Sequence, residues 1–336
     1  TRAGAYLLHT PADAVLDADG HQQGVDEQLS FVHVPCNFGQ TVVARALFAT
    51  HEPTANETQL AQYLMWNSTG KSDSNSERRL REMLRPGGEL WSNFNWMLWS
   101  KSNVTGCPLL YTPTRLWPAP IKRRYLTTDH GRQQLGAVQH RTFGVLRDPH
   151  DRMANVFRAV AGVARDARAM QFFPQGYLTE GEEAAQRYRR YFDTCDVNGW
   201  LQEELPKVIA GDPYRNMCHM LPQADFFSPD LDLLAGPTIR LDNRRFPDAA
   251  NELLAAHGYA MRIVAADINS NTACNVSAYS LTEPTMALIR TAYKADFDMV
   301  CETFGYCDPY ERTCLSHVDK LQGKGAGDVG MCGDMA

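Results

Sequence analysis

Residues 31–41 read FVHVPCNFGQT and lead directly into VVARAL at residues 42–47. A second stretch, TFGVLRDPHDR, occupies residues 142–152. Each stretch predicts a buried strand, then a tight polar turn, then the start of a helix. Such a unit directs backbone N–H groups and the positive end of the helix toward an anion. Two of these units in one chain can therefore hold a ligand that carries phosphate at both ends.

Strands and helices alternate along the chain. We expect strands over residues 29–35, 124–128, 141–146 and 238–241, and helices over residues 40–50, 149–164, 182–192, 199–209, 247–257 and 282–303. This alternation implies an α/β fold with a central, mostly parallel sheet that is flanked by helices. We expect one domain over residues 30–312, an irregular segment over residues 1–29 and a glycine-rich tail over residues 313–336.

The overall composition argues against two classes of partner. The chain has 336 residues, of which 44% are hydrophobic and 21% charged, an ordinary globular mixture. Its formal net charge of −6 provides no general footprint for nucleic acid, and residues 122–124 (KRR) form the best local basic run. No run of about 20 apolar residues occurs, so we expect no membrane span in this chain.

Cysteines and glycosylation sequons point to the secretory pathway. The nine cysteines include no C-x-x-C pair, so we expect no metal site. Sequons for N-glycans occur at Asn56, Asn67, Asn103 and Asn275. Together these features favour a disulfide-bonded glycoprotein, either in the Golgi lumen or outside the cell. The odd number of cysteines leaves one thiol free or paired with another chain; the alternative is a cytosolic protein with free thiols.

The second stretch has the form R-x-P-x-x-R at the start of a helix. Its first arginine, Arg147, follows a strand, and open α/β sheets bind ligands at the carboxyl ends of their strands. An arginine there can make bidentate contacts with phosphate. The alternative is a structural device at the start of the helix, in which Asp148 and Arg152 form an ion pair. The first stretch, in contrast, lacks the G-x-x-x-x-G-K-[ST] pattern of a Walker P-loop.

These two stretches resemble the sulfotransferases, particularly the Golgi carbohydrate O-sulfotransferases that use 3′-phosphoadenosine-5′-phosphosulfate. In that family a V-P-K-T-G-G-T-like loop cradles the 5′-phosphosulfate, and an L-R-D-P-x-x-R-x-x-S segment holds the 3′-phosphate. Residues 214–216 (YRN) and 221–225 (LPQAD) resemble the mid-chain substrate segment of the family. Residues 293–306 resemble its closing Y-x-x-D-F…F-G-Y pattern. The resemblance covers roughly residues 30–310 and implies a P-loop-like sulfotransferase fold.

The resemblance assigns the donor site to residues in both stretches. They are Pro35, Cys36, Asn37, Phe38, Gly39, Gln40 and Thr41 for the 5′-phosphosulfate, and Arg147 and Asn155 for the 3′-phosphate.

Several of these residues depart from the family pattern. Cys36 stands where the family has the lysine that neutralises charge on the bridging oxygen as sulfate leaves, and a neutral thiol cannot supply that charge. Asn37 replaces a threonine. Phe38 replaces a glycine where the backbone must approach phosphate closely. Asn155 replaces a serine, which is a milder change because an amide can still donate to phosphate.

The acceptor hydroxyl needs a general base, and the resemblance points to His130, which follows the strand expected before the second stretch. Its neighbour Asp129 is a candidate to orient it, and Arg45 is a weaker candidate for the missing positive charge. Two functions stay open. The first is an active sulfotransferase with a carbohydrate acceptor. The second is a catalytically inactive protein of the same fold that serves as a structural or binding subunit of an extracellular protein assembly.

Overall fold

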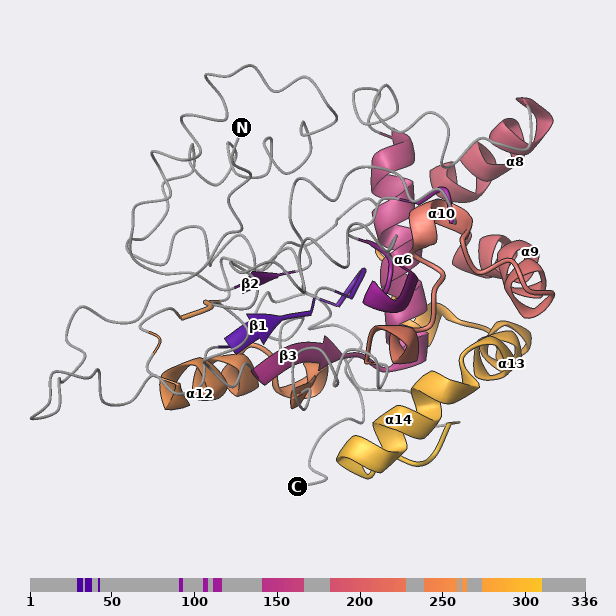
Figure 1. Cartoon of the computed structure of the whole chain (residues 1–336). Coiled ribbons are helices and arrows are strands. Elements are labelled where there is room, and N and C mark those ends of the chain that lie inside the picture. Colours follow the sequence, from indigo (N-terminus) through magenta and orange to yellow (C-terminus); the bar gives the residue numbers. More distant parts are fainter. Residues whose placement is uncertain are drawn as a thin grey trace, which may run out of the picture.

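The computed structural model describes the helices and strands labelled in Figure 1 and the segments next to them. It describes residues 29–32, 34–37, 42, 91–92, 105–107, 111–116, 141–165, 182–227, 239–257, 259, 262–264 and 274–309. The strand predicted over residues 124–128 lies outside these ranges. The helix predicted over residues 40–50 is described only at Val42, which is helical.

Within the described residues, four parallel strands form a sheet, in the spatial order β2-β1-β3-β4. They are β1 (Leu29–Phe31), β2 (Trp91–Ser92), β3 (Arg141–Leu146) and β4 (Ile239–Asp242). Phe31 pairs with Phe143, and Leu146 pairs with Asp242. Because the strands are parallel, β1, β3 and β4 end at the same edge of the sheet. The α/β class with a mostly parallel sheet is therefore confirmed, although the first strand is shorter than predicted.

Helices account for most of the other described residues. The α-helices are α6 (Pro149–Arg165), α8 (Glu182–Asp193), α9 (Val197–Ile209), α10 (Arg215–Cys218), α12 (Asp248–Ala256), α13 (Glu283–Ala292) and α14 (Lys294–Phe304). Short 3-10 helices are η3 (Thr114–Leu116), η4 (Gln223–Phe227), η5 (Asn243–Arg245) and η7 (Ala278–Ser280). In Figure 1 the sheet lies on one side of α6, and α8, α9 and α13 lie on the other.

The prediction of one continuous helix over residues 282–303 was wrong. The structure has two helices, α13 and α14, which are separated at Tyr293, whose φ of −119° and ψ of 31° are not helical. The Tyr293 side chain is fully buried, and its hydroxyl donates a hydrogen bond to the carbonyl of Met220 at 2.9 Å. A tertiary contact of this kind lies beyond the helical periodicity from which the single helix was predicted.

Both faces of the sheet are covered by apolar packing. Leu29, Phe31, Phe143 and Val145 face α12. A second apolar cluster covers the opposite face of the sheet. It packs Val32 and Val34, which follow β1, and Leu146 of β3 against η4 and α14. Successive residues of a strand point to opposite faces, so Leu146 of β3 and the valines that follow β1 cover the second face, and the sheet is packed on both sides.

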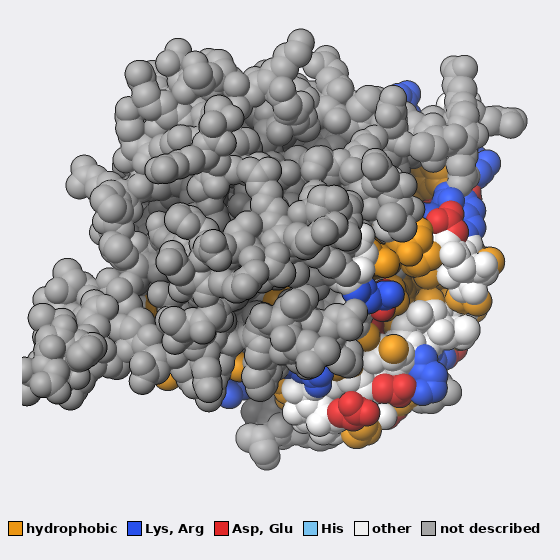
Figure 2. All heavy atoms as spheres, in the orientation of Figure 1, with side chains coloured by type: hydrophobic (Ala, Val, Ile, Leu, Met, Phe, Trp, Pro, Cys, Tyr) orange, Lys and Arg blue, Asp and Glu red, His pale blue; other side chains and the backbone are white. Residues whose placement is uncertain are grey.

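A third apolar cluster holds the helices together. Phe157 of α6 and Trp200 of α9 are completely buried, and their ring centroids lie 5.6 Å apart. The outer surfaces of these helices carry both signs of charge, as the face in Figure 2 shows. Lys294 and Asp298, for example, form an exposed ion pair at 2.6 Å on α14.

Three disulfides join described cysteines: Cys107–Cys218, Cys195–Cys274 and Cys301–Cys307. Cys36 is the free cysteine of the described residues. Asn275 is exposed, whereas the other three sequons lie outside the described residues. None of the described helices combines the length and the apolar character that crossing a membrane requires. The disulfides fit a secreted or lumenal protein.

The two disulfides that differ most in span allow a test of what they contribute. Replacing Cys107 and Cys218 together with Ser is expected to lower the free energy of unfolding by about 4–5 kcal/mol, because the bond closes a sequence separation of 111. The Cys301–Cys307 bond closes a separation of 6, so the matched double replacement is expected to cost about 2 kcal/mol. Urea unfolding followed by tryptophan fluorescence measures both. Equal losses would contradict this expectation.

Candidate functional site

The chain turns sharply after β1. The amide of Asn37 donates to the carbonyl of Val34 at 3.2 Å, which places Pro35 and Cys36 at the two central positions of the turn. Cys36 has a φ of +65°, a left-handed conformation that glycine adopts more readily than other residues. Proline followed by a residue of positive φ is the pattern of a type II turn. The predicted phosphosulfate loop thus starts with a tight turn, in which Cys36 carries a side chain at the position of positive φ.

Asn37 has a structural role. Its side chain is buried, and Nδ2 donates to the carbonyl of Val145 at 2.9 Å and to Oε1 of Gln223 at 2.7 Å. Gln223 in turn pairs with the backbone of Arg147, accepting from its N–H at 3.1 Å and donating to its carbonyl at 2.5 Å. Asn37 Nδ2 therefore joins the turn to the end of β3 and to η4.

The close approach of η4 to β3 depends on Gly144. A Cβ atom at this position would lie 2.7 Å from the ring of Phe227. A side chain there would push η4, and Gln223 with it, away from the end of β3. Gly144 thus sets the distance at which the segment over residues 221–225 meets the edge of the sheet.

Asp148 caps the N-terminus of α6. Its Oδ1 accepts hydrogen bonds from the backbone N–H groups of His150 at 2.9 Å and Asp151 at 3.1 Å. This satisfies two of the unpaired donors at the start of the helix, as an aspartate at this position commonly does. The second stretch therefore has a structural role at the start of the helix, with Asp148 as the N-terminal cap.

Arg147 lies next to the β1 turn. Its Nη1 donates to the carbonyl oxygen of Cys36 at 3.0 Å, and its Nε donates to Oδ2 of Asp151 at 2.6 Å. Asn155, two turns into α6, donates to the same Cys36 carbonyl at 2.9 Å. The two side chains that the resemblance assigns to the 3′-phosphate thus converge on one oxygen atom of the other stretch. The structure brings the two stretches together at one edge of the sheet.

Arg152 is completely buried and connects three segments. Its Nε lies 3.4 Å from the carbonyl of Pro35, and its Nη2 donates to the carbonyl of His219 at 3.1 Å. Its ionic partner is Asp296, with Nη1 and Oδ2 3.9 Å apart, so the prediction that Arg152 pairs with Asp148 at the helix start is wrong.

Asp296 links α14 to η4. It accepts backbone hydrogen bonds from Gln223 at 3.0 Å and from Ala224 at 2.8 Å. Burial raises the pKa of its carboxyl group to about 6, against the opposing influence of Arg152 and of the two backbone donors. Asp296 therefore holds η4 against α14 through a carboxyl group whose pKa is about 6.

The thiol of Cys36 is neutral at physiological pH. Burial raises its pKa to about 11, although the positive charges of Arg152, Arg147 and Arg158 act in the opposite direction. The turn therefore lies in the field of three guanidinium groups but carries no charge of its own at the position where the family has lysine. Within the described residues, the charge that would attract an anion to this turn comes from the arginines of α6 and its preceding loop.

Arg158 is the residue that sequence reasoning missed. Its Nη2 donates to Oδ1 of Asn155 at 3.0 Å, which orients the amide whose other end binds the Cys36 carbonyl. Positions 147, 151, 155 and 158 are spaced by four, four and three residues. They therefore lie on one face of α6 and of the residues that lead into it. That polar stripe is visible in the sequence and is the signal that would have identified Arg158.

The segment assigned to substrate, residues 214–216, has its side chains engaged within the protein. Arg215 Nε and Asn216 Nδ2 donate to Oε2 of Glu204 at 2.9 and 2.7 Å. Burial of Glu204 acts to raise its pKa, but hydrogen bonds from Arg215, Tyr188 and Lys207 outweigh it and leave the pKa lowered. This buried carboxylate joins α8, α9 and α10.

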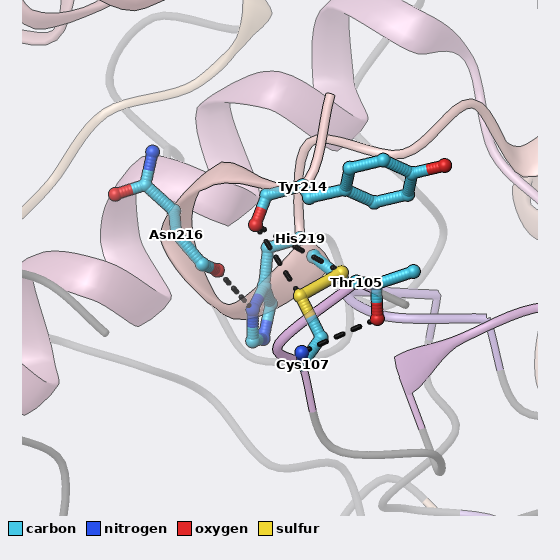
Figure 3. Close-up of a disulfide and its surroundings, with 6 residues drawn as sticks. Thr105, Cys107, Tyr214, Asn216 and His219 are labelled. Carbon is cyan, nitrogen blue, oxygen red and sulfur yellow. Dashed lines mark hydrogen bonds between the residues drawn. A yellow bond between two sulfur atoms is a disulfide. The ribbon is translucent and has the colours of Figure 1, made fainter. Parts of the chain in front are cut away.

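A disulfide fixes α10, which contains Arg215 and Asn216 of this segment (Figure 3). Cys218 lies on α10 and bonds to Cys107, whose backbone N–H donates to Thr105 Oγ1 at 3.2 Å. At the next residue, Nδ1 of His219 lies 2.7 Å from the carbonyl of Asn216, and the His219 ring lies 4.7 Å from the ring of Tyr111. The His219 carbonyl that binds Arg152 is therefore held in place by covalent and aromatic contacts.

The remaining site predictions stay predictions. Phe38, Gly39, Gln40 and Thr41 lie outside the described residues, as do the proposed base His130 and the alternative cation Arg45. Comparisons of the chain with protein-family models, with curated proteins and with solved structures find no match.

The raised pKa of Cys36 predicts its chemical reactivity. Because the thiolate is the reactive form, alkylation of Cys36 in the native protein is expected to accelerate through pH 9 without levelling off, in keeping with a pKa of about 11. Iodoacetamide labelling across a pH series, quantified on the peptide that contains Cys36, measures this. A plateau at or below the ordinary thiol pKa of 9.0 would contradict the expectation.

Asp296 predicts a pH dependence of stability. The folded protein holds this proton more tightly than the unfolded chain, so the stabilising contribution is complete below pH 3.8 and is lost as pH rises through about 6. Relative to Asp296→Asn, the unaltered protein is expected to lose stability on the order of 3 kcal/mol across this interval. Urea unfolding at a series of pH values measures the difference. The exposed Asp298→Asn on the same helix is the control; an identical pH profile for Asp296→Asn and the unaltered protein would contradict the prediction.

Proposed function

We propose that the protein is a sulfotransferase of the secretory pathway, which takes sulfuryl from 3′-phosphoadenosine-5′-phosphosulfate and transfers it to a carbohydrate hydroxyl. The observation that carries this proposal is the contact between the two predicted phosphate-binding stretches. Arg147, at the end of β3, lies 3.0 Å from the Cys36 carbonyl in the turn after β1. Adjacent parallel strands whose carboxyl ends bear such turns form the usual ligand edge of an α/β sheet.

The charges at this edge support an anionic ligand. Arg147, Arg152 and Arg158 all act on the Cys36 position. Guanidinium groups suit phosphate because they donate in a planar, bidentate geometry. The disulfides support a Golgi or extracellular location, where a sulfotransferase would meet glycans.

In the proposed reaction each residue keeps the role that the resemblance gives it. Residues 35–41 hold the 5′-phosphosulfate, and Arg147 and Asn155 hold the 3′-phosphate. The acceptor oxygen forms a bond to sulfur as the bond between sulfur and the phosphate oxygen breaks, His130 takes the hydroxyl proton, and adenosine 3′,5′-bisphosphate leaves. The sulfated glycan and the bisphosphate nucleotide are the products.

A second function has its own support. The neutral thiol of Cys36 stands where charge on the leaving oxygen must be neutralised. A protein of this fold without that charge would serve as a catalytically inactive structural or binding subunit of an extracellular assembly. Its glycans at Asn56, Asn67, Asn103 and Asn275 would suit that role.

Nucleotide binding tests the proposed function. Titration calorimetry with adenosine 3′,5′-bisphosphate is expected to show binding, and Arg147→Lys is expected to weaken it about tenfold or more, because lysine loses the forked donor geometry. Arg189→Gln, an exposed arginine on α8, is the matched control. An absence of heat with folded, concentrated protein would contradict the proposal.

Activity separates the two functions. If the chain is a sulfotransferase, the unaltered protein transfers labelled sulfate to glycan acceptors, and this result would exclude the inactive subunit. If the chain binds nucleotide but transfers only as the Cys36→Lys variant, the missing charge alone accounts for the loss of catalysis, and the subunit role is supported.

A further inference from the structure

The Cys36 carbonyl occupies the donors that a phosphate would need. Arg147 Nη1 donates to it at 3.0 Å and Asn155 Nδ2 at 2.9 Å. A carbonyl oxygen and a phosphate oxygen are both acceptors, and each makes short hydrogen bonds to guanidinium and amide donors. The N–H groups that point at the Cys36 carbonyl can therefore serve either this internal acceptor or an external one at the same position, but not both at once.

An external anion has little access to these donors in this conformation. Arg147 is only 2% exposed, and its Nε is held by Asp151 at 2.6 Å. The β1 turn lies against its Nη1. A phosphate can take the place of the Cys36 carbonyl at Nη1 only if the turn moves away from it.

Asn37 anchors the end of the turn to β3 and η4, but the peptide of Cys36 is held less firmly. Cys36 is left-handed with a φ of +65°, which is unfavourable for a residue with a Cβ atom. The other contact between the turn and α6, from Arg152 Nε to the Pro35 carbonyl, is long at 3.4 Å. The two hydrogen bonds to the Cys36 carbonyl are thus the principal polar contacts that hold this peptide against α6.

We propose that a bound nucleotide phosphate and the Cys36 carbonyl compete for Arg147 and Asn155, so that nucleotide binding releases the β1 turn from α6. This inference rests on the proposed function. It makes Arg147 and Asn155 positioning residues of the turn in the nucleotide-free protein. It also couples occupation of the 3′-phosphate site to a movement of residue 36, where the family lysine would stand.

The reactivity of Cys36 reports the position of the turn without any need for catalysis. Asn155→Ala removes one of the two hydrogen bonds and is expected to raise the rate of Cys36 alkylation about two- to tenfold. Asn198→Ala is the matched control, because the Asn198 side chain makes a comparable bond to the Ser280 carbonyl, at 2.8 Å and away from the turn. Labelling is quantified by mass spectrometry of the Cys36 peptide, and circular dichroism confirms that both variants fold.

Addition of nucleotide completes the test. Saturating adenosine 3′,5′-bisphosphate is expected to accelerate Cys36 alkylation in the unaltered protein and to have a smaller effect in Asn155→Ala, where the turn is already released. Protection of Cys36 by nucleotide would overturn the competition but not the proposed function. The same holds if Cys36 is alkylated equally fast in Asn155→Ala and in the unaltered protein, while the unaltered protein binds nucleotide. Calorimetry without binding would overturn the proposed function and the competition with it.

Discussion

One backbone oxygen, the Cys36 carbonyl, organises this edge of the sheet. Arg147 at the end of β3 and Asn155 on α6 both donate to it, so the turn after β1 is tied to the next strand and to the helix that follows that strand. Arg152 extends the same connection to His219 and Asp296. The arrangement explains why segments more than a hundred residues apart in sequence form a single local structure.

Burial determines the chemistry of this edge. Two guanidinium groups, those of Arg147 and Arg152, lie almost entirely out of solvent beside the acidic side chains of Asp151 and Asp296. Buried charges are tolerated when they are paired and hydrogen-bonded, and here backbone carbonyls complete the pairing. The same burial keeps the Cys36 thiol neutral. The edge therefore offers positive charge from α6 and its preceding loop, and none from the turn.

Local sequence patterns predicted the parts of the fold that depend on residues near one another in the chain. The strand over residues 141–146 and the helix from Pro149 followed from an apolar run and a proline at a helix start, and both are present. The break at Tyr293, the Cys107–Cys218 and Cys195–Cys274 disulfides and the contact of Arg152 with Asp296 depend on residues distant in sequence, so periodicity could not predict them. For the site, the neighbourhood of Arg147 and the turn was predictable, whereas the donation of Arg147 and Asn155 to a carbonyl was not. The roles of His130 and of the loop after Asn37 stay predictions.

The most direct test of this account is a crystal structure of the full chain grown with adenosine 3′,5′-bisphosphate. The account predicts a phosphate group within hydrogen-bonding distance of Arg147 and Asn155, with the Cys36 carbonyl turned away from both. A nucleotide bound elsewhere, with both hydrogen bonds to the Cys36 carbonyl intact, would contradict it.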